Sequence, residues 1–293
     1  MTPQTDSDSA AATPETIHLR LNELSLKRRE KLRQIFETPR EFVLLSVRAA
    51  AGRLNTDPAT LVRTVQQLGF PSYRAFQNYL HDLSIANATA FDGMQQNDHP
   101  NGKVPDHLRV TLEQDVKNLN ELRNSVDVKR LNALAKRIHS ARRVLILGGD
   151  LAENLVHYAE HHLTLIGLPV LAATTAGRSI HVSRSIGEGD LVIAISFRRG
   201  LRQTIESLQR ARANGAYCVG ITGTYVSPIA RFTDEFFVAS VESRSFIDSY
   251  VAPMALMNLI LVACGNYKRE ATLRLLQEAA KEQRHGFRWY GTE

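Results

Sequence analysis

Two arginines in the second half of the chain could bind an anion. Arg198 and Arg199 come shortly after the apolar run 191–195, and Ser196 follows that run directly. A guanidinium group binds a phosphate or a carboxylate through two parallel hydrogen bonds, and the start of a following helix also favours an anion. The alternative is that both arginines lie solvated on the surface, and the sequence leaves the two possibilities open.

Polar residues also follow other short apolar runs. Five runs rich in Val, Ile, Leu and Phe alternate with helical segments, at residues 144–147, 169–173, 191–195, 218–221 and 235–238. This order predicts a doubly wound α/β domain, a five-stranded parallel sheet with helices on both faces. Ligands of such sheets bind beyond the carboxyl ends of the strands. The predicted small-molecule site comprises Gly148, Gly149, Asp150, Ala152, Thr174, Ser196, Arg198, Arg199, Thr204, Thr222, Thr224 and Glu242.

Catalytic and metal-binding chemistry have weaker support. Proton-transfer catalysis needs a general base, for which Glu242 and His181 are the candidates, but we expect both to be surface or capping residues. His157 and His161, with Glu153 and His162 nearby, could bind zinc, although such a set is more often a solvated helix face. No G-x-G-x-x-G fingerprint with an acidic partner and no Walker A lysine is present. We therefore predict no catalytic residue, no metal and no cofactor.

The N-terminal third predicts two short helices joined by a tight turn. Ser46 can cap the first helix, and Asn55 tolerates the left-handed backbone that a tight turn requires. The second helix has two start signals, Asp57 as N-cap and Pro58 at the first helical position, and Gly69 ends it. This pattern favours a helix-turn-helix in an all-α domain, although a plain helical bundle would carry the same caps.

The second helix of this pair has two different faces. Leu61, Val65 and Leu68 form the stripe that we expect to be buried, and the opposite face carries small polar groups and one arginine. In a DNA-recognition helix such residues reach base edges, while nearby cations face phosphates. The predicted DNA-binding residues are Pro58, Ala59, Thr60, Arg63, Thr64, Gln67, Lys27, Arg28 and Arg29.

Composition and charge bound the class of protein. The chain has 293 residues, of which 43% are hydrophobic and 23% charged, and a formal net charge of +6 that favours a polyanionic partner. No apolar stretch approaches the roughly 20 residues that span a bilayer, and residues 1–14 lack the features of a secretory signal. We therefore expect a cytoplasmic protein with no membrane partner. Cys218 and Cys264 are expected to be buried, reduced thiols.

These patterns predict two domains and a linker. We expect a disordered arm over residues 1–15, the helix-turn-helix domain over 16–92, a linker rich in Gly, Asn, Asp and Pro over 93–106, connecting helices over 107–142, the α/β domain over 143–265, and a C-terminal helix and tail over 266–293.

The N-terminal part resembles a known family of regulators. The segments Ser46-Val-Arg-Ala-Ala-Ala and Asp57-Pro-Ala-Thr-Leu-Val-Arg63, followed by Leu68-Gly-Phe70 and Tyr73-Arg-Ala-Phe76, are similar to the DNA-binding domain of RpiR bacterial transcription regulators, over about residues 18–88. The resemblance implies a ligand-responsive regulator rather than an enzyme, and we expect a repressor. It would bind a palindromic double-stranded DNA operator as a homodimer or a homotetramer, because the two-fold symmetry of the protein then matches the two-fold symmetry of the DNA site.

The C-terminal part resembles the usual second domain of the same family. Segments 195–204 and 221–230 are similar to motifs of the sugar isomerase (SIS) domain, over about residues 125–264. Where that family has a Gly-x-Gly-x-Ser turn for a sugar phosphate, this chain has Asp150 and Ala152 in place of the second Gly and the Ser. The expected effector is a small anionic metabolite, a phosphosugar or a related compound, held by Arg198 or Arg199. A non-sugar anion such as a carboxylate or a folate-like cofactor is one alternative, and a phosphosugar isomerase is the alternative of another class.

Overall fold

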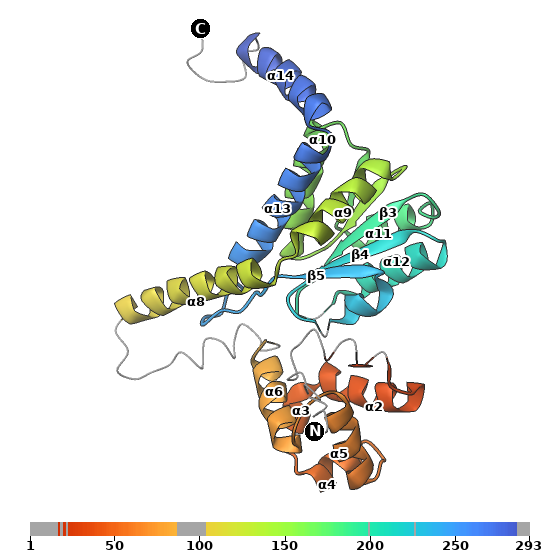
Figure 1. Ribbon diagram of the computed structural model, residues 1–293, viewed down its shortest axis with the longest axis vertical. Helices are drawn as coiled ribbons and strands as arrows, with labels where there is room; N and C mark the ends of the chain where they lie inside the picture. Colours follow the sequence, from red (N-terminus) through yellow and green to blue (C-terminus); the bar gives the residue numbers. More distant parts are fainter. Residues whose placement is uncertain are drawn as a thin grey trace, which may run out of the picture. The chain divides into compact units, whose positions relative to one another are not determined.

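The structure is a computed structural model that describes residues 17, 20–21, 23–86, 104–198, 200–225 and 227–285. The predicted arm over residues 1–15, most of the predicted linker and Arg199 lie outside the described residues. The chain forms two compact units, residues 1–95 and 96–293 (Figure 1).

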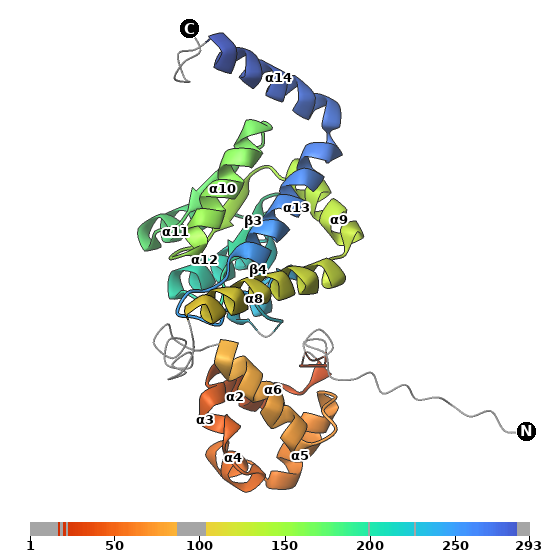
Figure 2. The same ribbon diagram turned by 90° about the vertical axis from the view of Figure 1, so that its left-hand side faces the viewer.

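The described elements of the first unit are helices that surround an apolar core (Figure 2). Phe42, Phe76 and Leu68 are completely buried there, and the rings of Phe70 and Phe76 pack edge to face with their centroids 5.1 Å apart. The elements are α2 (Leu26–Glu37), α3 (Pro39–Val43), α4 (Val47–Arg53), α5 (Pro58–Gln67) and α6 (Tyr73–Ala86). The predicted all-α architecture is confirmed.

The local signals that predicted α4 and α5 act as expected. The Ser46 hydroxyl accepts a hydrogen bond from the Ala49 N–H at 3.3 Å, and α5 begins at Pro58. Asn55 has a φ of +46° in the turn between the helices, and Gly69 has a φ of +95° just after α5. A residue without this backbone freedom would strain either turn, so the sequence itself fixes where the two helices begin and end.

We expect Asp57→Ala to destabilise α5 by about 1 kcal/mol, because a lost N-cap acceptor typically costs that much. The Asp57 carboxylate accepts from the Thr60 N–H at 2.9 Å. Hydrogen exchange of the α5 amides measures the effect, and Asp57→Asn, which keeps an acceptor, is the matched control. Equal exchange rates in the two variants would contradict a capping role.

The second unit contains a five-stranded sheet in which all neighbouring strands are parallel, in the order β2-β1-β3-β4-β5. The strands are β1 (Val144–Leu147), β2 (Val170–Ala173), β3 (Leu191–Ile195), β4 (Tyr217–Thr222) and β5 (Glu235–Val238). The helices are α8 (Val104–Ser125), α9 (Val128–Ser140), α10 (Ala152–Leu165), α11 (Ala176–Ser183), α12 (Arg202–Ala213), the short 3₁₀ helix η1 (Pro228–Phe232), α13 (Val251–Tyr267) and α14 (Arg269–His285).

Helices cover both faces of this sheet, as the alternation of side chains along β1 demonstrates (Figure 1). Val144 and Ile146 belong to a buried cluster that includes side chains of α9, α10 and α13. Leu145 and Leu147 belong to a second cluster on the other face, with side chains of α12. A strand buried on both faces has no reason to alternate polar and apolar residues. The predicted doubly wound fold is confirmed.

Some boundaries differ from the prediction. Helix α8 begins at Val104, inside the predicted linker, because proline is compatible with a first helical turn and Pro105 does not delay the helix. Helix α13 continues to Tyr267, past the predicted domain end at residue 265. Cys218 and Cys264 are buried as expected, and burial raises the pKa of each thiol to about 12.

Within the described residues no helix combines the length and apolarity needed to cross a membrane alone. Only α13 and most of α14 together reach that threshold, across a bend of 103°.

Candidate DNA-binding and effector-binding sites

The outer surface of α5 carries most of the residues predicted to contact DNA. Ala59, Arg63 and Gln67 are exposed, and Pro58 and Thr60 are half-buried. Leu61, Val65 and Leu68 face the core with at most 3% of their surface accessible, which confirms the predicted buried stripe. The helix therefore presents one arginine and small side chains at its solvent face, as major-groove recognition requires.

Two residues of the predicted set are engaged elsewhere. Thr64 is only 4% exposed, because it lies beside Leu61 and Val65 on the buried side of α5. Its hydroxyl donates to the Thr60 carbonyl at 2.7 Å. Arg29 is half-buried, and its Nε donates to the Leu21 carbonyl at 3.1 Å while its Nη2 donates to the Leu24 carbonyl at 3.4 Å. Both residues serve the fold of the first unit, so we omit them from the contact set.

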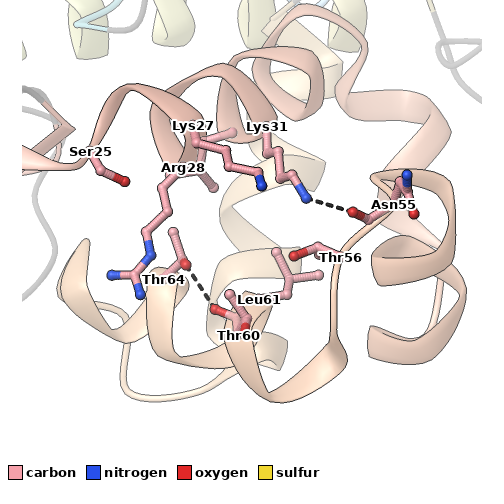
Figure 3. A pocket seen from close by; sticks show the side chains of 10 residues that line it. Ser25, Lys27, Arg28, Lys31, Asn55, Thr56, Thr60, Leu61 and Thr64 are labelled. Carbon is pink, nitrogen blue, oxygen red and sulfur yellow. Dashed lines mark hydrogen bonds between the residues drawn. The ribbon is translucent and has the colours of Figure 1, made fainter.

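The basic residues of α2 line a groove against α5 and the turn before it (Figure 3). The groove has a volume of about 340 Å³, and Lys27, Arg28 and Lys31 line it. Arg28 Nη1 donates to Gln67 Oε1 at 3.0 Å, and Lys31 Nζ donates to the Asn55 carbonyl at 2.6 Å. We call this feature the α2–α5 groove. The sequence places Lys31 in the same basic cluster as Lys27 and Arg28 but not in the predicted contact set, although its i, i+4 spacing from Lys27 places both on one face of α2.

In the second unit, glycines allow three loops to meet at the carboxyl edge of the sheet. A Cβ atom on Gly149, after β1, would lie 3.0 Å from the Thr174 carbonyl oxygen, after β2, and 2.9 Å from Leu201 Cδ1, before α12. A Cβ atom on Gly148 would lie 3.3 Å from the Ile195 carbonyl oxygen at the end of β3. Only glycine fits this approach, which brings the turns after β1, β2 and β3 into contact.

Arg198 forms an ion pair within the chain at this edge. Its Nη2 lies 2.5 Å from Asp248 Oδ1, and the two side chains are 19% and 21% exposed. Burial raises the pKa of the neighbouring Tyr250 phenol above its ordinary value; the charges of Asp248 and Asp150 raise it further, and Arg198 opposes them. These four residues, Asp150, Arg198, Asp248 and Tyr250, are called the turn cluster below. Arg198 is thus not the solvated side chain that one of the two initial possibilities described.

The other predicted effector-binding residues have varied surroundings. Ser196, Thr204 and Thr222 are buried, and the Thr222 hydroxyl has no hydrogen-bond partner among the described residues. The Thr174 hydroxyl donates to Glu153 Oε1 at 3.0 Å. Ala152 is buried beneath the β1 turn, 3.5 Å from where a Cβ of Gly148 would lie, and Thr224 is half-buried.

Glu242 was predicted to belong to the small-molecule site, and in the structure it lies against α8. Its carboxylate and its carbonyl contact α8: Gln114 Nε2 donates to Glu242 Oε2 at 3.3 Å, and Asn118 Nδ2 donates to the Glu242 carbonyl at 2.8 Å. The reason is that the chain after β5 runs across α8 before it enters α13, so this carboxylate meets the polar side chains of that helix. His181, the other candidate base, is exposed on α11.

The segment after β5 connects the turn cluster to α8. The Ser249 hydroxyl donates to Asp115 Oδ1 at 2.6 Å, next to Asp248, and the Ser240 hydroxyl donates to Asn118 Oδ1 at 3.2 Å. Asn118 is completely buried although it is polar, so this contact is a fixed part of the fold. Sequence reasoning missed Asp248 and Asp115; for Asp248 the available signal was the mostly polar segment between the predicted strand 235–238 and the apolar helix that follows.

Carboxylates outnumber cations among the described groups around the turn cluster. Asp150, Asp248 and the nearby Glu153 are acidic, whereas Arg198 is the cation among these groups. The candidate zinc ligand His157 lies between Glu153 Oε1, at 3.4 Å, and Glu160 Oε2, at 3.2 Å. In the described part of the chain, no group of three His, Cys, Asp or Glu side chains is arranged to hold a metal ion.

Comparisons with known proteins agree with both units. Residues 137–263 match the SIS domain family. The chain is 23% identical over 281 residues, 92% of its length and 94% of the relative's, to the HTH-type transcriptional regulator HexR of Escherichia coli K12.

Two solved structures are similar in fold. The sugar isomerase domain of an RpiR transcription factor from Sphaerobacter thermophilus is 26% identical, with a TM-score of 0.57, and the match covers 61% of this chain and 99% of that one. The Vibrio vulnificus NanR protein, solved in complex with ManNAc-6P, is 20% identical, with a TM-score of 0.56 over 91% of this chain and 98% of that one. The second unit is thus a SIS domain, and the chain as a whole, with its helical first unit, is similar to helix-turn-helix transcription regulators of the RpiR and HexR type.

Proposed function

We propose that this regulator binds a palindromic DNA operator as a homodimer through α5, and that a small anionic effector bound at the turn cluster changes its affinity for the operator. The observation that carries the proposal is the surface of α5, where Arg63 and Ala59 are exposed on a helix flanked by the α2–α5 groove. A recognition helix needs base-reading side chains and phosphate-binding cations side by side, and this surface supplies both.

An electrophoretic shift assay on the DNA upstream of the protein's own coding region tests this function. The protein should bind that fragment more tightly than random DNA of equal length, and both affinities should fall as salt increases, because phosphate contacts release counterions. Equal affinity for the two DNAs, or none for either, would refute operator binding.

An exposed apolar stripe supports the dimer. On α8, Leu108, Leu112 and Val116 recur at i, i+4 and i+8 and are 68%, 65% and 51% exposed. Large apolar side chains aligned in this way on a helix surface usually mark a protein contact. A second copy of the chain is the occupant that operator symmetry requires, since one recognition helix contacts too few base pairs for useful specificity.

The effector proposal rests on exchange of one anion for another. Asp248 already neutralises Arg198, so an effector phosphate or carboxylate would take its place and leave Asp248 free to move. Because Ser249, the next residue, is bonded to Asp115 of α8, this exchange would disturb α8, the first described helix of the second unit. Asp150 would repel the dianion of a simple hexose phosphate, so we expect such compounds to bind weakly.

We expect Arg198→Ala to abolish effector binding and Asp248→Asn to strengthen it. The first change removes the guanidinium that holds the anion, and the second removes its competitor. Calorimetry with hexose 6-phosphates, sugar acids and folate-like carboxylates measures both, and Arg184→Ala, an exposed arginine just after α11, is the control. Tight hexose phosphate binding that survives Arg198→Ala would exclude this site and restore an ordinary phosphosugar cradle. Tight binding of a folate-like carboxylate alone would select the non-sugar effector.

A repressor and an isomerase make different predictions. A repressor without effector should lower transcription from its target promoter in a purified system, and the effector should restore it. An isomerase would interconvert aldose and ketose phosphates, a conversion that NMR detects directly. Neither candidate base favours the isomerase, because Glu242 is bonded to α8 and His181 is exposed on α11.

A further inference from the structure

The α2–α5 groove has the chemistry of an oxyanion site. Lys27, Arg28 and Lys31 line one side, and Thr56 and Thr60 line the other, so cations and hydroxyl groups face the same space (Figure 3). No acidic residue of the described chain lines it. At about 340 Å³ the groove holds roughly ten water volumes, enough for a phosphodiester group with part of its solvation.

Two of the three cations are held in position by the fold. Lys31 Nζ donates to the Asn55 carbonyl at 2.6 Å, and Arg28 Nη1 donates to Gln67 Oε1 at 3.0 Å. Because these bonds already restrict the two long side chains, the side chains lose less conformational entropy when they bind an anion. Both partners are neutral acceptors, so the two bonds leave the positive charge of the side chains uncompensated.

We propose that the α2–α5 groove binds one backbone phosphate of the DNA strand that runs beside α5, with Lys27 and Lys31 as its principal contacts. The inference rests on the proposed function. The groove lies along the side of α5 that carries Thr60 and Thr64, whereas Arg63 belongs to the outer face. A helix in the major groove has a sugar-phosphate strand on each flank, so a basic groove on one flank of α5 meets phosphate when Arg63 faces the bases. This contact fixes the register of α5 on the duplex and carries no sequence information.

The first experiment measures the salt dependence of DNA binding by the full chain. Lys27→Gln with Lys31→Gln should weaken binding to operator and to random DNA by the same factor, about 5- to 20-fold at moderate salt. The slope of log affinity against log salt should fall by about 1 for one lost phosphate contact. Lys129→Gln with Lys136→Gln, two exposed lysines of α9, is the control for net charge and should leave the slope unchanged. An unchanged slope in the double variant overturns the inference.

The second experiment identifies the phosphate. Operator duplexes are prepared with a neutral methylphosphonate at one backbone position at a time. One position in each half-site should weaken binding of the natural protein and have no further effect on the double variant, because the contact is already lost. If every sensitive position weakens both proteins alike, the groove does not hold a backbone phosphate.

A free phosphorylated metabolite has the same chemistry and is the competing ligand. If it were the occupant, inorganic phosphate or a hexose phosphate would raise the melting temperature of the natural protein but not of the double variant, while the salt slope for DNA would stay the same. That result overturns the DNA assignment.

Two controls separate misfolding and failure of the function. Lys27 is exposed, so Lys27→Gln alone preserves the Lys31 bond and carries the methylphosphonate comparison if the double variant is unstable. A natural protein that fails to bind any operator refutes the proposed function. A natural protein that binds, with a double variant of unaltered slope, refutes only the phosphate contact.

Discussion

Replacing Arg63 by Ala should reduce operator affinity by roughly 1 to 3 kcal/mol for each half-site, or about 5- to 150-fold, if the guanidinium contacts a base edge. Arg63 is exposed on α5, which begins at a capped N-terminus that fixes the axis of the helix. A guanidinium that donates two hydrogen bonds to a guanine discriminates against other bases, because the wrong base leaves its donors unpaired. The loss on random DNA should be smaller.

Competition gel shifts on operator and random DNA measure both losses. Arg63→Lys is the matched variant, because it keeps the charge and removes the planar fork; it should restore binding to random DNA and leave most of the operator loss. Equal losses on the two DNAs would make Arg63 a phosphate contact. No loss on either would mean that α5 does not lie in the major groove.

Local signals explain why so much of the fold could be predicted. Ser46, Asn55, Asp57 and Gly69 each act through a hydrogen bond or a backbone angle within a few residues, so their effect is visible in a short stretch of sequence. The five strands are likewise short runs of buried residues, and their parallel order follows from the helices that alternate with them. These features fix the starts of α4 and α5 and place the five strands to within one residue.

Long-range pairs explain what could not be predicted. Arg198 was expected to meet either a ligand or solvent, and Asp248, fifty positions away in the chain, neutralises it instead. Arg29 was counted as a DNA-facing cation, and the carbonyls of the segment before α2 bind it. Composition gives the number of charges in a domain but not their partners, because partners depend on how separate elements pack.

Arg142 and Arg143, just before β1, form ion pairs with Asp190, and we expect replacement of Asp190 to have a large effect on stability. Asp190, directly before β3, has a fully buried carboxylate that accepts from Arg142 Nη2 at 2.8 Å, from Arg143 Nη2 at 2.9 Å and from the Gly187 N–H at 3.1 Å. Burial alone would raise the pKa of Asp190, but the hydrogen bonds from both arginines and Gly187, with the charge of Arg143, outweigh it and hold the pKa well below its ordinary value. The carboxylate thus joins the starts of two adjacent strands in its charged form.

We expect Asp190→Asn to lower the free energy of unfolding by about 2 to 3 kcal/mol at neutral pH, because hydrogen bonds to a buried charge are lost and both arginines, partly exposed, can regain water. A group whose folded pKa is depressed stabilises the fold above its unfolded pKa, and this contribution disappears as pH falls through the folded value. The difference between natural protein and variant should therefore be constant from about pH 5 to pH 8 and shrink below about pH 4.

Urea unfolding followed by circular dichroism over that pH range measures the difference, and Glu188→Gln, which removes an exposed carboxylate two positions away, is the control and should change little. Arg142→Gln should cost less than Asp190→Asn, because Asp190 keeps Arg143 and Gly187 as donors. A difference that persists unchanged to pH 2 would mean that the charge of the carboxylate is not what holds β1 and β3 together. Such a result would leave the two arginines as ordinary surface residues at the amino end of the sheet, opposite the edge where the turn cluster lies.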